Sequence, residues 1–288
     1  MKPITLGDVT IARVIEIGRS SYPTAAMLPD SSPEAIARHL PWLRPHFWDD
    51  TTGDLGSRIG TYVVRTPRTT ILIDTGVGNH KTRAHNAAWH MRDGSFLADL
   101  AAAGVTPAQV DVVLCTHLHV DHVGWNTRWE GGRWVPTFPK ARHVFAGNEW
   151  DFWKHETASG RDENGNIADS VVPIVDAGLA VLVDSDYQVD PWVRFEPAPG
   201  HTPGHVCVRL RTSAGEAVFS GDLMHRTVQV AEPQWSSQFC HDGKQAALTR
   251  REFVERCADS GVLVLPAHFP HPGYVVRENG GHRFVPAP

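Results

Sequence analysis

The stretch of sequence that says most about the fold is THLHVDHVG, residues 116–124. It places four side chains that can bind a metal, His117, His119, Asp121 and His122, within six positions. In extended chain, residues two apart point to the same side, so His117 and His119 can bind one ion together. The chain must then turn, helped by the final glycine, to aim Asp121 and His122 at a second ion. Imidazole and carboxylate ligands suit Zn²⁺ and also Fe, Co or Mn.

The residues just before this cluster are apolar. Val112–Cys115 has the composition of a short strand that is buried on both faces. A single histidine after such a strand is most often a hydrogen-bonded structural residue. Four polar donors in a row are different, because a purely structural role would leave several buried polar groups to satisfy. A metal site is therefore the better interpretation of this cluster.

Further metal-binding side chains follow other apolar segments downstream. One ion needs about four donors, so two ions need more than the first cluster supplies. The segment APGHTPGH, residues 198–205, contains His201, and FSGD ends at Asp222. The segment LPAH ends at His268. All three supply further donors of the same chemical types, imidazole and carboxylate.

These motifs, in this order, closely resemble the metallo-β-lactamase superfamily over residues from about 61 to 268. The resemblance implies an α/β fold, the αββα sandwich, in which two mixed sheets pack face to face with helices outside. It also implies a pair of metals at the edge of the sheets. Carried onto this sequence, the resemblance gives His117, His119 and His201 to one metal, Asp121, His122 and His268 to the other, and Asp222 to both as a bridge.

Two further residues take supporting roles by the same resemblance. Asp74, in the sequence IDTG, matches a position that supports the metal ligands from behind. His205 usually has a structural role in such segments and is left out of the ligand set. The implied cofactor is two Zn²⁺ per chain, with Fe, Co or Mn as alternatives.

The implied chemistry is metal-dependent hydrolysis. Two close dications can share a bridging hydroxide and polarise a substrate oxygen, and zinc lowers the pKa of bound water towards about 7. Asp121 is the expected catalytic side chain that orients the hydroxide and passes a proton to the leaving group. Asp222 offsets the repulsion between the two ions.

Within the superfamily, the chain looks most like the branch of lactonases and methyl-parathion-hydrolase-like enzymes. The resemblance rests on GDLMH at 221–225, VQ at 228–229 and the run from 249 to 270 that contains PAHFP. It implies hydrolysis of lactones or esters, with phosphotriesterase side activity. Acyl-homoserine lactonases of the best-known type place a tyrosine near the bridging aspartate, whereas here the nearest polar candidate is His225, which disfavours acyl-homoserine lactones as the natural substrate. His225 is expected either to contact the substrate or its leaving group, as a second catalytic residue, or to be a hydrogen-bonded structural histidine.

Other activities remain as alternatives. A β-lactamase of the commonest type would have cysteine at position 222 and an export signal. A glyoxalase II-like thioester hydrolase shares the ligands but would need a basic glutathione-binding site in an added helical region. A mononuclear iron dioxygenase, a different class of enzyme, would leave Asp121 and His122 without metals to bind. Metal content discriminates this last alternative from a dinuclear hydrolase.

Composition limits the partners. The 288 residues have a net charge of −5 and a pI near 6.4, so no nucleic-acid partner is expected. No apolar run approaches the ~20 residues that cross a bilayer, so no membrane partner is expected. The first ten residues lack a leader-like apolar core, so the expected location is cytoplasmic. The four cysteines lack a C-x-x-C pair and are expected to be free.

We expect a small-molecule substrate with an apolar portion, because many aromatic residues accompany the metal motifs. The candidates for the walls of its pocket are Trp42, Phe47, Trp48, Trp125, Trp129, Trp134, Trp150 and Trp153. Most of them are equally suited to the core or to an interface.

The chain is expected to form one domain over residues 1–288, with residues 18–57 as a lid or a dimerisation segment of a homodimer. Hydrophobic periodicity predicts the other elements. The expected strands are Val9–Ile17, Ile59–Val64, Thr70–Asp74, Val112–Cys115, Ala141–Ala146, Ala180–Val183, Val193–Pro197, Val206–Leu210, Ala217–Ser220 and Val262–Leu265. The expected helices are Gly94–Ala103, Glu149–Glu156, Val171–Ala177 and Lys244–Ala258, and a hairpin over Tyr274–Val285 is expected to turn at Asn279-Gly280.

Overall fold

The computed structural model describes residues 2–19, 22–162 and 164–288. The chain divides into two compact units that are interleaved in the sequence. The first unit comprises Met1–Glu16 and Ile59–Ser185, and the second comprises Ile17–Arg58 and Asp186–Pro288. That the whole chain acts as one domain stays a prediction.

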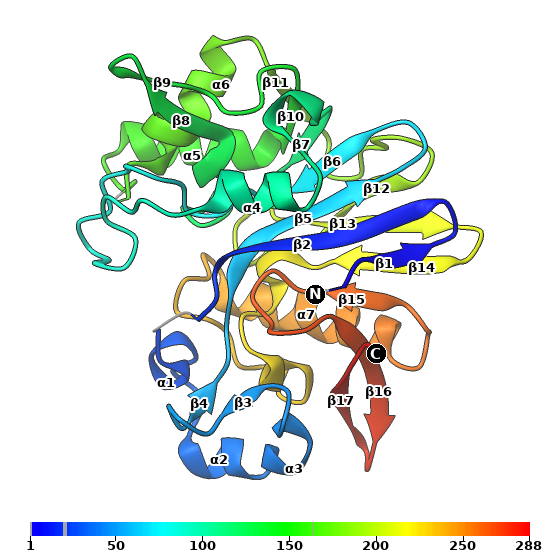
Figure 1. Cartoon of the computed structure of the whole chain (residues 1–288). Helices are drawn as coiled ribbons and strands as arrows, with labels where there is room; N and C mark the ends of the chain where they lie inside the picture. Colours follow the sequence, from blue (N-terminus) through cyan, green and yellow to red (C-terminus); the bar gives the residue numbers. More distant parts are fainter. Residues whose placement is uncertain (1, 20–21, 163) are drawn as a thin grey trace. The chain divides into compact units, whose positions relative to one another are not determined.

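The first unit is built on a seven-stranded mixed sheet with the order β1-β2-β5-β6-β7-β10-β11 (Figure 1). The strands β6, β7, β10 and β11 run parallel to one another, so their carboxyl ends lie at one edge of the sheet. The strand bounds are β1 Ile4–Leu6, β2 Val9–Ile17, β5 Ile59–Arg65, β6 Thr70–Ile73, β7 Val112–Leu114, β10 Arg142–Ala146 and β11 Ala180–Val183. The first histidine cluster follows β7 at this edge.

Helices cover one face of this sheet. They are α4 Phe96–Ala102, α5 Gly147–Ala158, the π-helix η3 Ile167–Val171 and α6 Val172–Asp176. Phe96 and Leu100 from α4 and Ile174 from α6 pack in one apolar cluster with Leu72 and Val113 of the sheet. All residues of β7 are buried, as the sequence predicts for a strand covered on both faces. A small hairpin, β8 Thr127–Glu130 and β9 Arg133–Pro136, follows the histidine cluster and the short 3₁₀ turn η2 Gly124–Asn126.

The second unit has a six-stranded mixed sheet in sequential order, in which only β14 and β15 are parallel (Figure 1). Helix α7 Gly243–Cys257 packs on it through Phe253 and Val254. The last two strands turn at Asn279 and Gly280, whose φ angles of 51° and 78° are those of the predicted hairpin turn. The strand bounds are β12 Val193–Pro197, β13 Val206–Thr212, β14 Gly215–Phe219, β15 Leu263–Leu265, β16 Gly273–Glu278 and β17 Gly281–Pro286.

The segment from 18 to 57 is not a featureless loop. It forms three short helices and a two-stranded hairpin: α1 Thr24–Met27, α2 Pro33–Ala37, α3 Leu40–Leu43, β3 Trp48–Asp49 and β4 Asp54–Leu55. Met27, Leu28, Leu43 and Phe47 are buried in the core of the second unit. Phe47 is therefore a core residue, and it also lines a small pocket beside Trp48, Arg58 and Pro270. A role of the segment as a lid or dimerisation surface stays a prediction.

The predicted elements are confirmed, with end points that shift by a few residues. The sequence analysis missed β1, the hairpins β3–β4 and β8–β9, the helices α1–α3 and the π-helix η3. The described cysteines are free, and three of them are buried. Among the described residues, no helix is both long and apolar enough to cross a membrane.

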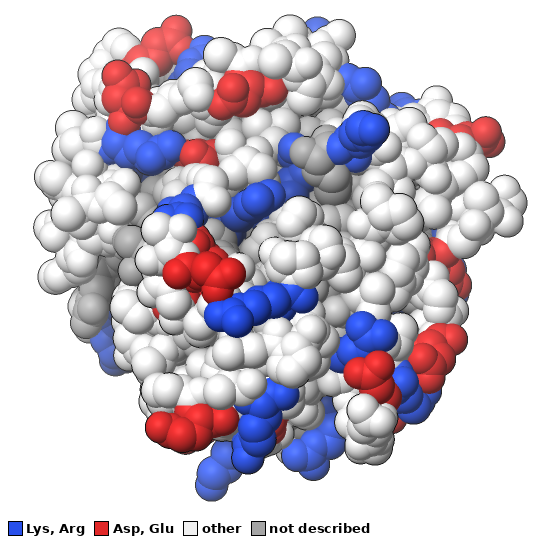
Figure 2. Space-filling model, turned by 60° about the horizontal axis from the view of Figure 1, so that its bottom comes forward, with Lys and Arg blue, Asp and Glu red and all other residues white. Residues whose placement is uncertain are grey.

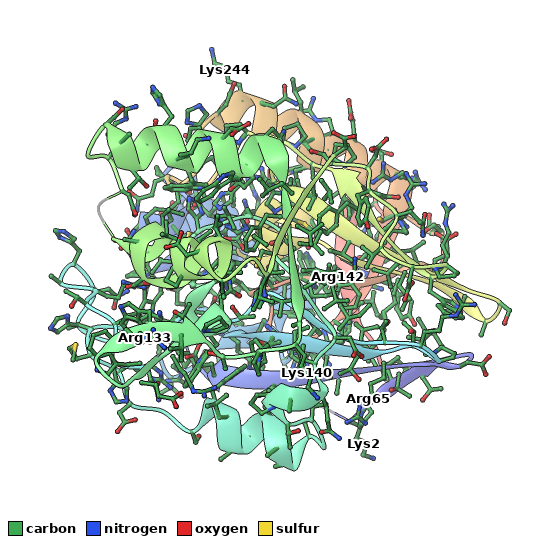
Figure 3. The ribbon with its side chains drawn as sticks, turned by 90° about the horizontal axis from the view of Figure 1, so that it is seen from above. Lys2, Arg65, Arg133, Lys140, Arg142 and Lys244 are labelled. Atoms are coloured by element: carbon green, nitrogen blue, oxygen red, sulfur yellow. The ribbon has the colours of Figure 1, made fainter. Side chains whose placement is uncertain are left out.

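The surface carries charges of both signs. Acidic and basic side chains are interspersed over the face drawn in Figure 2. In the view of Figure 3, Arg133 on β9 lies apart from Arg65 at the end of β5 and Arg142 at the start of β10. The charged residues thus belong to several different elements.

Candidate metal centre

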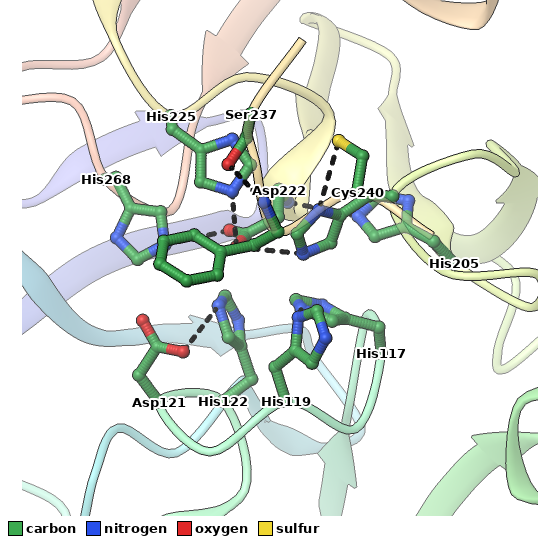
Figure 4. Close-up of polar contacts among 12 residues, drawn as sticks. His117, His119, Asp121, His122, His205, Asp222, His225, Ser237, Cys240 and His268 are labelled. Carbon is green, nitrogen blue, oxygen red and sulfur yellow. Dashed lines mark hydrogen bonds and ion pairs between the residues drawn. The ribbon is translucent and has the colours of Figure 1, made fainter. Parts of the chain in front are cut away.

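In the first unit, His117 and His119 converge as the spacing predicts. The Nε2 atom of His117 lies 3.0 Å from the Nδ1 atom of His119 (Figure 4). The hydroxyl of Thr116 lies 3.1 Å from the other ring nitrogen of His117, Nδ1. His117 is therefore held so that Nε2 remains available to a metal.

Asp74, at the end of β6, holds the next part of the cluster. Its carboxylate accepts a hydrogen bond from the backbone N–H of Thr116 at 2.8 Å, and its Oδ2 atom lies 2.9 Å from Nδ1 of His122. The neighbouring Asp121 has its Oδ1 atom 3.7 Å from Nε2 of His122. Asp74 has a φ angle of 56°, in the left-handed region that few non-glycine residues adopt. The structure thus places Asp74 behind the candidate ligands, where the family resemblance implies it.

The turn that follows the cluster requires glycine. The N–H of Gly124 donates to the carbonyl of Gly76 at 2.7 Å. A Cβ atom at Gly124 would lie 1.9 Å from the carbonyl carbon of Val77. The chain can make this close approach only because position 124 has no side chain.

In the second unit, the carboxylate of Asp222 is the centre of a group of buried histidines (Figure 4). Its Oδ2 atom lies 3.3 Å from Nε2 of His201 and 3.1 Å from Nε2 of His225, and its Oδ1 atom lies 2.9 Å from Nε2 of His268. The structure thus brings together the three ligands that the sequence predicts in this half of the chain, with His225 beside them.

The outer nitrogens of these ligands have fixed partners. The Nδ1 atom of His268 lies 3.0 Å from the carbonyl oxygen of Arg58, and Nδ1 of His201 lies 3.6 Å from Sγ of Cys240. Metal-binding histidines typically donate their second ring N–H in this way, which fixes the tautomer and leaves Nε2 for the ion. Burial raises the pKa of the Cys240 thiol to about 11.

His205 has the structural role that the sequence analysis assigns to it. Its Nδ1 atom lies 3.0 Å from the carbonyl of Ala198, and its Nε2 atom accepts a hydrogen bond from the backbone N–H of Asp222 at 3.0 Å. The imidazole thereby ties the loop after β12 to the residue that follows β14.

The loop before His201 is packed tightly against the start of α7. Gly200 has a φ angle of 131°, and a Cβ atom there would lie 2.3 Å from the backbone nitrogen of Ala246. The hydroxyl of Thr249 donates to the carbonyl of Pro199 at 2.7 Å, and the N–H of Asp242 donates to the carbonyl of Gly200 at 2.9 Å. The position of His201 is therefore set by α7.

His225 is buried, and burial lowers its pKa to about 4, so its imidazole is neutral near pH 7. Its Nε2 atom points to Asp222, and among the described residues its Nδ1 atom has no hydrogen-bond partner. Its catalytic role stays a prediction.

The candidate pocket aromatics separate into different environments. Trp153 contacts the ring of His119, with the ring centroids 5.3 Å apart. Trp125 stacks on Phe96 inside the core, and Trp129 is 49% exposed on β8. Of these residues, Trp153 is the one that the structure places against a candidate ligand.

The sequence analysis missed several residues that hold the ligands. Glu149, Asn166, the carbonyl of Arg58 and the thiol of Cys240 all touch the histidine motifs or their backbone. They are far from their partners in the sequence, so no local pattern indicates them. Thr116 is the exception, because it belongs to the quoted motif.

The donor set fits metal ions. Each unit presents buried or half-buried imidazole and carboxylate groups, and the candidates are His117, His119, Asp121, His122, His201, Asp222 and His268. These are the ligand types of zinc sites, and their outer atoms are held by hydrogen bonds as in such sites.

Comparison with known proteins identifies the family. The sequence profile of the metallo-beta-lactamase superfamily matches residues 60–268. The chain is 24% identical to an N-acyl homoserine lactonase of Bacillus cereus over 166 residues, which are 52% of this chain and 57% of that protein. It is 29% identical to metallo-beta-lactamase domain-containing protein 1 of Xenopus laevis over 178 residues, 62% of this chain and 59% of the other. The chain thus spans less than two thirds of the length of these relatives.

Solved structures agree over nearly the whole chain. The hydrolase AbOPH of the beta-lactamase superfamily superposes with a TM-score of 0.81 at 25% identity, over 99% of this chain and 97% of that one. The dizinc quorum-quenching lactonase AidC superposes with a TM-score of 0.76 at 20% identity, over 100% and 97% of the two chains. The chain therefore belongs to the metallo-β-lactamase superfamily and has its αββα sandwich fold.

Proposed function

We propose that the chain is a dinuclear zinc-dependent hydrolase that cleaves lactone or ester bonds. The observation that carries the proposal is the orientation of the candidate ligands: Nδ1 of His122, His201 and His268 is held by Asp74, Cys240 and the Arg58 carbonyl. Together with the imidazole and carboxylate donors that converge in each unit, this orientation is typical of metal ligands.

In this proposal the two groups of ligands serve one dinuclear centre. Seven side chains supply eight bonds when one carboxylate bridges, which matches two ions with about four donors each. His117, His119 and His201 would hold one ion, Asp121, His122 and His268 the other, and Asp222 both.

When bound there, two zinc ions would make hydroxide available near neutral pH and polarise the substrate's reacting oxygen. The chain's own residues supply the remaining steps. Asp121, whose carboxylate is half-buried, is the proposed carrier of a proton to the leaving group. His225, with Nε2 at 3.1 Å from Asp222, is the second proposed catalytic residue, which steadies that carboxylate or contacts the leaving group.

The relatives support lactones and simple esters as the substrate class. Both the curated relative from Bacillus cereus and AidC are lactonases. Phosphotriester hydrolysis is proposed as a side activity, because a dinuclear site can stabilise a phosphoryl centre in the same way as a carbonyl. We propose that Trp153, which lies against His119, forms part of an apolar wall for the substrate.

A substrate panel on the zinc-loaded protein tests this function. We expect turnover of lactones or aryl esters, weaker turnover of phosphotriesters, and two zinc ions per chain by elemental analysis. His119→Ala should abolish turnover and reduce the metal content, whereas His155→Ala, at an exposed histidine of α5, should change neither.

Other outcomes would contradict the proposal in distinct ways. Turnover confined to β-lactams or to thioesters would replace the substrate class. One iron per chain with consumption of oxygen would indicate a dioxygenase. Full activity of His119→Ala at normal metal content would remove the assigned centre.

A further inference from the structure

Two buried side chains hold the backbone of Leu118, the residue between His117 and His119. The carboxylate of Glu149 accepts a hydrogen bond from the Leu118 N–H at 3.0 Å, and the side-chain amide of Asn166 donates to the Leu118 carbonyl at 2.8 Å. We propose that Glu149 and Asn166 are positioning residues that set the separation of the two imidazoles and thereby the affinity for the metal. This inference rests on the proposed function.

The geometry of the backbone explains why these two contacts matter. The N–H of Leu118 belongs to the peptide that joins it to His117, and its carbonyl belongs to the peptide that joins it to His119. Each peptide is planar, so a hydrogen bond to each fixes the orientation of both planes. Fixing the two planes limits how far the imidazoles can separate or rotate.

Burial makes these contacts strong. Glu149 and Asn166 are each 1% exposed, so water cannot replace them. A buried N–H or carbonyl that loses its partner destabilises the fold, and the backbone would shift to recover a hydrogen bond. A shift of Leu118 would move both histidines.

The two positioning residues are themselves anchored. Glu149 lies in the first turn of α5, directly after β10. Asn166 immediately precedes the π-helix η3, which Asp169 ties to Arg83 by two hydrogen bonds of 2.7 and 2.9 Å. The buried ammonium of Lys81 lies 3.4 Å from the same carboxylate. π-Helical turns are frequently found at functional sites.

Glu149 also links the histidine pair to Trp153. The same oxygen that binds Leu118 accepts a hydrogen bond from the indole N–H of Trp153 at 2.8 Å. The indole ring lies against the ring of His119. Glu149 therefore holds His119 in two ways: through the backbone of the neighbouring Leu118, and through Trp153, whose ring packs against the imidazole.

The chain contains a matched control for this residue. Glu16 is also a buried glutamate that accepts hydrogen bonds from an indole, that of Trp125 at 2.7 Å, and from backbone N–H groups, those of Val77 at 2.6 Å and Gly78 at 3.1 Å. None of its hydrogen-bond partners is a candidate metal ligand or the residue between two ligands. Replacing Glu16 removes the same kind of group from the same unit without releasing Leu118.

The test compares Glu149→Met, Glu149→Gln and Glu16→Met for zinc affinity by chelator competition and for the visible spectrum of the cobalt-substituted protein. We expect Glu149→Met to lose about 10–100-fold in zinc affinity and to change the cobalt spectrum. Glu149→Gln, which keeps an acceptor oxygen, should restore most of the affinity. Glu16→Met should lower the melting temperature and leave affinity and spectrum as in the wild type.

A further variant, Asn166→Asp, tests the same inference if Glu149→Met does not fold. It replaces the side-chain donor to the Leu118 carbonyl by an acceptor. It too should weaken zinc binding and alter the cobalt spectrum. Wild-type affinity and spectrum in the folded variants would overturn the inference while leaving the dinuclear centre intact. A wild-type protein that binds no zinc would instead overturn the proposed function and this inference with it.

Discussion

At the scale of single residues, the candidate ligand histidines combine a hydrogen-bond partner at the outer nitrogen with other metal-binding side chains nearby. His122 faces the carboxylate of Asp74, and His268 faces a backbone carbonyl. His143, in contrast, is buried in β10 with Nδ1 near the carbonyl of Ala141, and it belongs to no group of metal-binding side chains among the described residues. A hydrogen-bond partner at Nδ1 alone does not mark a histidine as a candidate ligand. A partner together with convergent metal-binding side chains does.

Replacing Asp74 by asparagine should weaken metal binding. Asn tolerates the left-handed backbone at this position, so the change removes mainly the charge behind His122 and one acceptor. We expect zinc affinity to fall by about 10-fold or more in chelator competition. Asp111→Asn is the control, because the Asp111 carboxylate also accepts a backbone N–H, that of Thr70 at 2.8 Å, but at an exposed site. Equal affinities in the two variants would argue against a supporting role for Asp74.

His143 should make the protein acid-sensitive. Burial lowers its pKa to about 4 from an ordinary value of 6.5. Between pH 6.5 and pH 4, His143 is therefore mostly protonated in the unfolded chain and mostly neutral in the folded chain. The free energy of unfolding therefore falls as the pH decreases from 6.5 to 4, by about 2 kcal/mol at pH 5.

His143→Leu removes this titrating group, so the free energy of unfolding should depend less on pH. Urea midpoints at pH 7 and pH 5, measured with a chelator so that metal release does not contribute, give the comparison. The variant should lose less stability than the wild type between the two pH values. A parallel loss would show that His143 accepts a proton while folded.

At the scale of elements, α7 positions His201 by a close backbone approach. Gly200→Ala should destabilise the second unit, because its φ of 131° is strained for alanine and the new Cβ would meet Ala246. We expect about 1–3 kcal/mol of lost unfolding free energy. In Gly53→Ala the φ is +64° and no atom lies within 4 Å, so the loss should be nearer to about 1 kcal/mol. Urea denaturation of both variants measures the difference, and equal losses would show that the loop can move away from α7.

The elements also show which features a sequence can predict. β2 and β11 have the predicted bounds because β-branched, apolar runs identify strands without knowledge of their neighbours. The helices α1 and α3 have four residues each, too few for a helical period to appear. The hairpin β8–β9 was missed although Gly131-Gly132 marks its turn, because its strands, TRWE and RWVP, contain charged residues and no continuous apolar, β-branched run.

The same distinction applies to the candidate site. The candidate ligands are indicated by their residue types and by their places after strands, so all seven candidates could be named from the sequence. Glu149 and Asn166 lie 31 and 48 positions from Leu118, and their roles depend on how α5 and η3 pack. Such partners follow only from the folded chain.

At the scale of the whole molecule, the candidate ligands are divided between the two units. His117, His119, Asp121 and His122 belong to the first unit, and His201, Asp222 and His268 belong to the second. The three donors of the second unit lie far apart in the sequence, so an unfolded chain would not present them together. Metal binding should therefore be coupled to folding, because the ions bind only the folded form.

Removal of the metals should consequently lower the melting temperature. An ion present at 100 times its dissociation constant adds about 2.7 kcal/mol to the stability of the folded form. At roughly 2–4 °C per kcal/mol for a chain of this size class, the loss of each ion should cost about 5–10 °C. Calorimetry or thermal fluorescence, with and without a strong chelator, measures the change.

Added Zn²⁺ should restore the melting temperature, whereas Mg²⁺, which prefers oxygen ligands, should not. His155→Ala should behave as the wild type, and His119→Ala should show a smaller response. An identical melting temperature with and without chelator, in a protein shown to contain zinc, would mean that the ions do not stabilise the fold.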